Sequence, residues 1–115
     1  MKIGITQIIY KSSLDELLQL CQDAGYEAVE LFFTEGGEMD IGLDDDSLEA
    51  VGERCREAGV TIGSVMARYR ESGSFLSPDP AHRQAAKRAL SRALEIGSVL
   101  GVEAVLLHPG AVEAS

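Results

Sequence analysis

The segment Leu100-Gly101-Val102-Glu103-Ala104-Val105-Leu106-Leu107-His108-Pro109-Gly110 contains the pattern that decides the fold. A helix is predicted to end at Gly101, because glycine readily adopts the left-handed conformation that closes many helices. A short apolar strand is predicted over residues 104–107, and His108 follows it directly, before a Pro-Gly turn. The segment therefore predicts a helix, a strand and a polar side chain at the carboxyl end of that strand.

Two earlier segments repeat this pattern of a helix end, a glycine and a strand, namely Asp23-Ala24-Gly25-Tyr26 and Glu57-Ala58-Gly59-Val60. Strands are predicted over residues 2–6, 27–33, 60–65 and 104–107. Helices are predicted between them, because polar residues suited to capping a helix N-terminus precede each apolar helical stripe. These capping residues are Ser13, the acidic run Asp44-Asp45-Asp46, and Asp79. The order β-α-β-α-β-α-β predicts an α/β protein with a parallel sheet and right-handed crossovers.

Two architectures are compatible with this order. One is half of a (β/α)₈ TIM barrel, a fold that typically needs about 250 residues. The other is a small doubly wound sheet, which usually carries a glycine-rich phosphate turn straight after its first strand. Here the residues after the first strand are Gln7-Ile8-Ile9-Tyr10, with no such glycines. We therefore predict the half-barrel, as a single incomplete domain over residues 1–115.

Composition narrows the class of protein. The chain has 115 residues, of which 45% are hydrophobic and 25% charged, and this balance is ordinary for a globular protein. Its net charge of −9 argues against a nucleic-acid partner, since such proteins usually present a basic face. No apolar run is long enough for a membrane helix, and no signal peptide is recognisable at the start. Cys21 and Cys55 lie in apolar helical patterns, which predicts buried reduced thiols and a cytoplasmic location.

Three segments together resemble a known family. They are Asp23-Ala24-Gly25-Tyr26-Glu27-Ala28-Val29-Glu30-Leu31, Leu76-Ser77-Pro78-Asp79-Pro80-Ala81-His82-Arg83, and the segment from Leu100 to Gly110. In this order they resemble the xylose isomerase-like TIM barrel superfamily of sugar phosphate isomerases and epimerases, which also contains the AP endonuclease family 2 fold. The resemblance spans essentially the whole chain but only the first half of the family's domain.

The resemblance implies a function for the intact domain. Members bind a divalent metal, often manganese, zinc or magnesium, and interconvert a small sugar or sugar phosphate through an enediolate-type proton transfer. Their principal metal ligands and proton-shuttling carboxylates come from the second half of the barrel. The resemblance therefore implies that the isolated chain is inactive and has no complete metal site of its own.

The resemblance also implies an alternative function, that of a metal-dependent AP endonuclease. Such members use the histidine of a His-Pro-Gly at the end of the fourth strand as a metal ligand, and His108 matches that position. They carry a further ligand histidine at the end of the third strand, where this chain has Met66-Ala67-Arg68-Tyr69. A third hypothesis is a non-catalytic protein, either a truncated product or a half-barrel that self-assembles into a homo-oligomer through its open sheet edges.

Four residues are candidates for substrate binding, because TIM-barrel chemistry sits at the carboxyl ends of the strands. Gln7 follows the first strand and is a candidate to hydrogen-bond a sugar. Glu30 lies in the second strand and needs a partner if buried, either substrate hydroxyls or a cation such as Arg68. Arg68 follows the third strand and is suited to a phosphate or carboxylate, or simply lies in solvent. His108 is a candidate substrate contact, or a histidine satisfied by neighbouring backbone.

Overall fold

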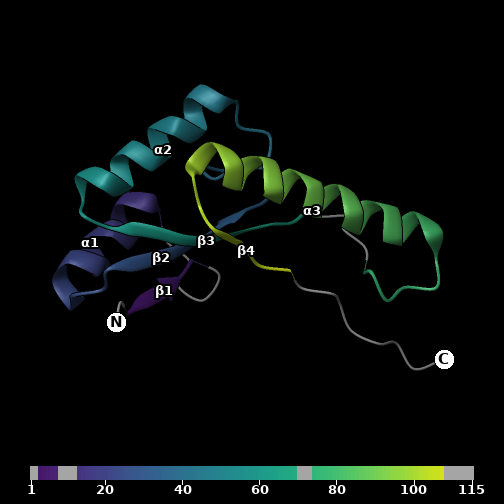
Figure 1. Ribbon diagram of the computed structural model, residues 1–115, viewed down its shortest axis with the longest axis horizontal. Helices are drawn as coiled ribbons and strands as arrows, with labels where there is room; N and C mark the ends of the chain where they lie inside the picture. Colours follow the sequence, from purple (N-terminus) through teal and green to yellow (C-terminus); the bar gives the residue numbers. More distant parts are fainter. Residues whose placement is uncertain (1–2, 8–12, 70–73, 108–115) are drawn as a thin grey trace.

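A computed structural model describes residues 3–7, 13–69 and 74–107. Its four-stranded parallel sheet consists of β1 (Gly4–Thr6), β2 (Ala28–Phe33), β3 (Thr61–Ala67) and β4 (Ala104–Val105). The helices of the described residues alternate with these strands (Figure 1) and are α1 (Leu14–Ala24), α2 (Asp45–Glu57) and α3 (Pro80–Leu100).

The strand order distinguishes the two architectures expected from the sequence. The strands lie in the order β1-β2-β3-β4, so each strand pairs with the next one along the chain. A doubly wound sheet would reverse direction at a switch point, which a TIM barrel does not. The prediction of half of a TIM barrel is confirmed. Because successive right-handed crossovers run in one direction, the helices cover one face of the sheet and leave the other face open.

Local capping chemistry sets the helix starts, as predicted. Ser13 Oγ accepts a hydrogen bond from the Glu16 backbone N–H at 3.1 Å, and Asp79 caps α3 in the same way through Ala81. Asp44 Oδ1 accepts from the Ser47 N–H at 2.8 Å, and hydrogen bonding from Ser47 lowers the pKa of Asp44 below its ordinary value. At the other ends, Gly25 and Gly101 adopt φ values of 77° and 72° and close α1 and α3.

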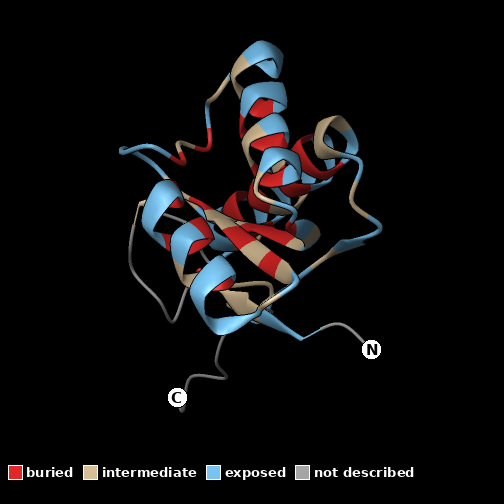
Figure 2. Ribbon diagram, turned by 90° about the vertical axis from the view of Figure 1, so that its left-hand side faces the viewer, coloured by how far each residue is buried: buried red, intermediate tan, exposed pale blue. Residues whose placement is uncertain are grey.

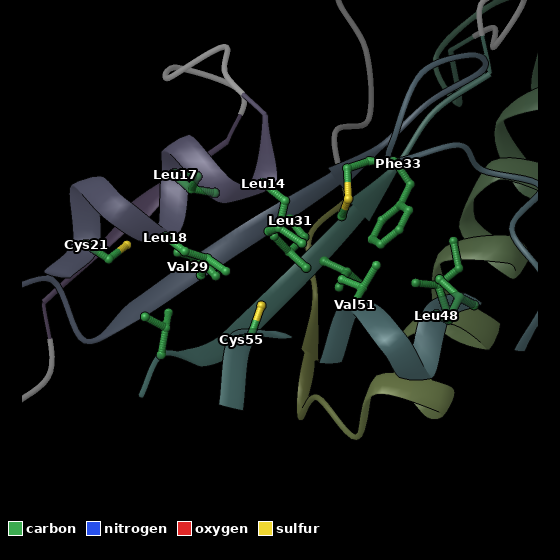
Figure 3. Close-up of a cluster of buried hydrophobic side chains, with 14 of the residues drawn as sticks. Leu14, Leu17, Leu18, Cys21, Val29, Leu31, Phe33, Leu48, Val51 and Cys55 are labelled. Atoms are coloured by element: carbon green, nitrogen blue, oxygen red, sulfur yellow. The ribbon is translucent and has the colours of Figure 1, made fainter. Parts of the chain in front are cut away.

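The core lies between the covered face of the sheet and the helices. Val29, Leu31 and Phe33 of β2 are buried, whereas the alternate residues of this strand are half-buried on the open face, a banding visible in Figure 2. Figure 3 shows these three side chains packed against residues of α1 and α2, namely Leu14, Leu17, Leu18, Cys21, Leu48, Val51 and Cys55. Both cysteines are free and buried, as predicted, and desolvation raises the pKa of Cys55 to about 11.

Some predicted bounds are wrong. Strand β3 continues to Ala67 instead of ending at residue 65, and β4 ends at Val105 instead of residue 107. The two residues after β4, Leu106 and Leu107, are each 47% exposed, because nothing in the described residues packs on the open side of this edge. On α3, Leu94 is 55% exposed, whereas its small neighbours Ala93 and Gly97 are buried.

No helix in the described part of the chain combines the length and the apolar character that crossing a bilayer requires.

Helix α3 approaches the sheet closely at Gly97, in its last turns. A Cβ at this position would lie 3.0 Å from Val102 Cγ2, 3.3 Å from Val105 Cγ2 and 3.5 Å from Val65 Cγ2. These three branched side chains come from β3, from β4 and from the short segment between α3 and β4. Together they close the space around Gly97. The missing side chain lets α3 lie directly on the sheet.

Gly97→Leu is therefore expected to lower the free energy of unfolding by about 1–3 kcal/mol, the usual cost of overpacking a core. Denaturant unfolding followed by circular dichroism measures it. Ser98→Leu is the matched control, because Ser98 is the exposed next residue of the same helix, and it should change the unfolding free energy by less than about 0.5 kcal/mol. Equal effects of the two substitutions would contradict the close contact.

Candidate functional site

A pocket of about 510 Å³ opens where the carboxyl ends of β1 and β2 meet the start of α1. We call it the β1–β2 pocket. Its lining residues are Gln7, Ser13, Leu14, Glu16, Phe32, Thr34, Gly36, Glu38 and Met39. The pocket thus lies on the side of the sheet where TIM-barrel enzymes carry their active sites.

Gln7 is the most buried polar residue of this pocket, with 9% of its surface exposed. Its backbone N–H donates to the Glu30 carbonyl at 3.0 Å, which extends the pairing of β1 and β2 by one residue. Its side-chain Oε1 accepts from the Phe32 N–H, also at 3.0 Å. That bond fixes which end of the carboxamide is the oxygen, because a backbone N–H can only donate. Within the described residues the Nε2 group has no hydrogen-bond partner, so it remains a donor for a ligand.

Glu30 lies at the centre of a polar network on the open face of the sheet. The Thr6 hydroxyl donates to Glu30 Oε1 at 2.9 Å, and the Ser64 hydroxyl donates to Glu30 Oε2 at 2.6 Å. A register shift between Val29 and Glu30 skips Gly63, so Ser64 stands opposite Glu30 on β3. The three side chains come from three adjacent strands and hold the carboxylate in one orientation.

Thr6 and Ser64 are the partners of Glu30, and not Arg68, the cation that the sequence left open as one possibility. The two hydroxyls satisfy Glu30 across the sheet, and its carboxylate makes no ion pair with Arg68. The Arg68 backbone N–H donates to the Phe33 carbonyl at 2.9 Å, and its exposed side chain does not line the β1–β2 pocket. His108 lies outside the described residues, so its predicted role stays a prediction.

The loop after β2 folds over the pocket and is held from two sides. Asp40 accepts hydrogen bonds from the backbone N–H groups of Gly42 and Gly36, and these bonds lower the pKa of Asp40 below its ordinary value. Arg92 of α3 donates through Nε to the Ile41 carbonyl and through Nη2 to the Leu43 carbonyl, both at 2.6 Å. The loop is therefore fixed to α3 by two charge-assisted hydrogen bonds.

This loop carries Glu38, a residue that sequence reasoning did not single out. Glu38 Oε1 accepts from the Leu14 backbone N–H at 2.9 Å, at the start of α1. Arg54 of α2 lies 3.7 Å from the same oxygen and also pairs with Asp15 of α1. Glu38 therefore links the loop, α1 and α2 at the edge of the pocket. In the sequence, Glu38 is marked only by being a carboxylate in a glycine-rich loop. This pattern is too common to identify a residue of a functional site.

The described residues do not fit a divalent metal. Among them, no group of three or more His, Cys, Asp or Glu side chains is placed to hold an ion. Both oxygens of the Glu30 carboxylate already accept hydrogen bonds from hydroxyls. No chemical step at this pocket is therefore assigned to a metal.

Comparison with known proteins agrees with this geometry. A sequence model for the family described as xylose isomerase-like TIM barrel matches residues 18–115. The chain belongs to this family. No curated relative matches the sequence.

Solved structures show the same fold. A putative xylose isomerase from Rhodospirillum rubrum superposes with a TM-score of 0.74 at 23% identity, over 99% of this chain and 41% of that one. A xylose isomerase domain protein from Planctomyces limnophilus gives 0.71 at 17% identity, over 99% and 43%. D-psicose 3-epimerase, solved in the presence of D-fructose, gives 0.67 at 17% identity, over 91% and 36%. This xylose isomerase-like chain thus spans about two fifths of the length of these structures.

Gln7→Leu tests the bond that orients the pocket carboxamide. The substitution removes the acceptor and leaves the Phe32 N–H without it, so we expect the free energy of unfolding to fall by about 1–3 kcal/mol. Hydrogen exchange followed by NMR should show faster exchange of the Phe32 amide. Gln19→Leu is the control, because Gln19 is an exposed residue of α1 whose side chain donates to Asp23 within the same helix. Unchanged protection of Phe32 in Gln7→Leu would contradict the assigned bond.

Proposed function

We propose that residues 1–115 form the first four strands and the three helices between them of a single barrel that isomerises or epimerises a small sugar or sugar phosphate. The observation that carries this proposal is the β1–β2 pocket at the carboxyl ends of the strands, in which the NH₂ group of a buried carboxamide has no partner among the described residues. Membership of the xylose isomerase-like family supports it. The fraction of each solved relative that the chain covers, 36% to 43%, supports the assignment to part of a barrel.

In this proposal the chain binds and orients the sugar. Gln7 donates to a substrate oxygen, and Arg68 lies at the end of β3 for an anionic group if the substrate has one. Glu30 stiffens the floor beneath through Thr6 and Ser64 and offers its carboxylate to sugar hydroxyls. His108, just after β4, is kept as a candidate substrate contact. Fixed donors of this kind lower a barrier by holding the reactant in one orientation.

Proton transfer belongs to groups outside the described residues. A base removes the proton from the carbon beside the carbonyl, and the electron pair of that C–H bond forms the enediolate. Return of a proton to the opposite face of that carbon gives the epimer, whereas return to the former carbonyl carbon gives the isomer. The divalent metal expected from the resemblance, manganese, zinc or magnesium, would have its ligands in the remaining half of the barrel.

The proposal is tested with the full protein encoded by the reading frame that contains this chain. We expect the full protein, supplied with Mn²⁺, to interconvert at least one of a panel of free ketoses, aldoses and their phosphates. In D₂O the product should carry deuterium at the reacting carbon, as the enediolate route requires. The 115-residue chain alone should show no turnover. Absence of turnover on the whole panel, together with cleavage of abasic DNA, would instead establish an endonuclease.

We further propose that the isolated chain self-associates through its open sheet edges. Strands β1 and β4 are the two edges of the sheet, and Ile3 and Leu106 beside them are 65% and 47% exposed. Unpaired parallel edges are a template for pairing with another chain. A two-fold closure would place β2 of each copy across the barrel from its equivalent. Glu30 would then face the same carboxylate of the second copy, and this repulsion weakens the dimer.

Sedimentation velocity at micromolar concentration is expected to show dimers or larger species, with a dimer fraction that rises in Glu30→Gln. Glu27→Gln makes the same charge change at an exposed residue just before β2 and should leave the fraction unaltered. A stable monomer in both the unaltered chain and Glu30→Gln would refute self-association.

The two buried free thiols are consistent with the predicted cytoplasmic location, which we retain as part of the proposal.

A further inference from the structure

We propose that the β1–β2 pocket binds a neutral, hydroxylated part of the substrate and excludes a phosphate group. This inference rests on the proposed sugar-converting function, and it names the chemical class of group that this end of the site accepts. An anionic group, where the substrate has one, would lie elsewhere on the carboxyl face, such as near Arg68 at the end of β3. The decisive contact is the hydrogen bond between Glu38 and the first residue of α1.

The start of a helix after a β-strand is the usual anion site of α/β proteins, because its free N–H groups and its dipole favour negative charge. In this chain two of these N–H groups already have acceptors. The Leu14 N–H donates to Glu38 Oε1 at 2.9 Å, and the Glu16 N–H donates to Ser13 Oγ at 3.1 Å. A phosphate entering the pocket would have to displace the carboxylate of Glu38 from the helix that stabilises it.

The charges around the pocket also disfavour the binding of a phosphate group. Its lining includes Glu16 and Glu38, and none of the described lining residues is a lysine or arginine. The nearby cation, Arg54, is shared between Glu38 and Asp15, so its charge is already balanced. Like charges within a few ångström disfavour each other even at a protein surface. The pocket therefore repels a phosphate dianion.

The same residues suit a polyol. A hydroxyl group both donates and accepts, whereas the dianion of a phosphate ester only accepts, so a hydroxyl is satisfied by a donor and an acceptor placed close together. Gln7 Nε2 supplies the donor from a side chain that is 9% exposed. Glu16, Glu38 and Thr34 supply acceptors, and Phe32 supplies apolar surface for the carbon face of a sugar. This combination binds carbon-bound hydroxyls without needing a positive charge.

Two titrations of the 115-residue chain, followed by ¹H–¹⁵N NMR, test the inference. D-fructose is the neutral probe and inorganic phosphate is the anionic probe, at matched ionic strength. We expect D-fructose to shift the side-chain NH₂ signals of Gln7. Phosphate should shift neither these signals nor the Leu14 amide signal.

Glu38→Ala should reverse the preference, because it frees the Leu14 N–H and removes a negative charge. We expect phosphate to shift the Leu14 amide signal in this variant and to bind roughly tenfold or more tightly than to the unaltered chain. Glu57→Ala is the matched control, since it removes the same charge from an exposed residue at the far end of α2. It should leave the response to phosphate unchanged.

Three results would overturn the inference. They are a phosphate-induced shift of Gln7 or Leu14 in the unaltered chain, no shift of Gln7 with D-fructose, and no gain of phosphate binding in Glu38→Ala. A phosphate response that disappears in Lys11→Ala, a cation outside the described residues, would overturn it in the same way. These failures are distinct from failure of the proposed function. A full protein that turns over while this pocket binds phosphate would refute only the inference, whereas D-fructose binding by a protein without turnover would refute only the function.

Discussion

The alternation of side chains along β2 is the constraint on which the rest of the structure depends. Val29, Leu31 and Phe33 face the helices and are almost completely buried, so the intervening residues must face the other way. A shift of one residue would turn Glu30 into the core, where an unpaired carboxylate is very costly. Packing against α1 and α2 therefore fixes the register, and the register places the carboxylate on the open face beneath the pocket.

Elements fixed by local chemistry were predictable from the sequence. Ser13, Asp44 and Asp79 cap their helices because a short polar side chain can reach the N–H groups of the next turn. Gly25 and Gly101 end helices because their positive φ costs glycine little. These choices depend on a few neighbouring residues, so they can be recognised without the fold. The parallel half-barrel follows once the elements are ordered, since crossovers between parallel strands have a preferred hand.

The candidate site was less accessible to prediction, because its contacts join residues far apart in the chain. The shift that skips Gly63 and brings Ser64 opposite Glu30 depends on how two strands pair, which the pattern of either strand does not reveal. Arg92 binds carbonyls of a loop about fifty residues earlier, and those carbonyls carry no side-chain signal. Glu38 reaches Leu14 only because that loop is fixed. The position of Gln7 directly after the first strand could be predicted from the sequence, whereas its hydrogen bond to Phe32 could not.

The distribution of these contacts bears on how the proposed function would divide between the two halves of a barrel. Gln7 and Glu30 are oriented by hydrogen bonds made wholly within β1, β2 and β3, so their positions do not require the remaining strands. A group held before the ligand arrives loses little entropy on binding. Proton transfer, in contrast, needs ionisable groups at defined distances from a reacting carbon. Under the proposed function, one half of a barrel would therefore hold a preorganised binding surface, and the other half would supply the groups that transfer the proton.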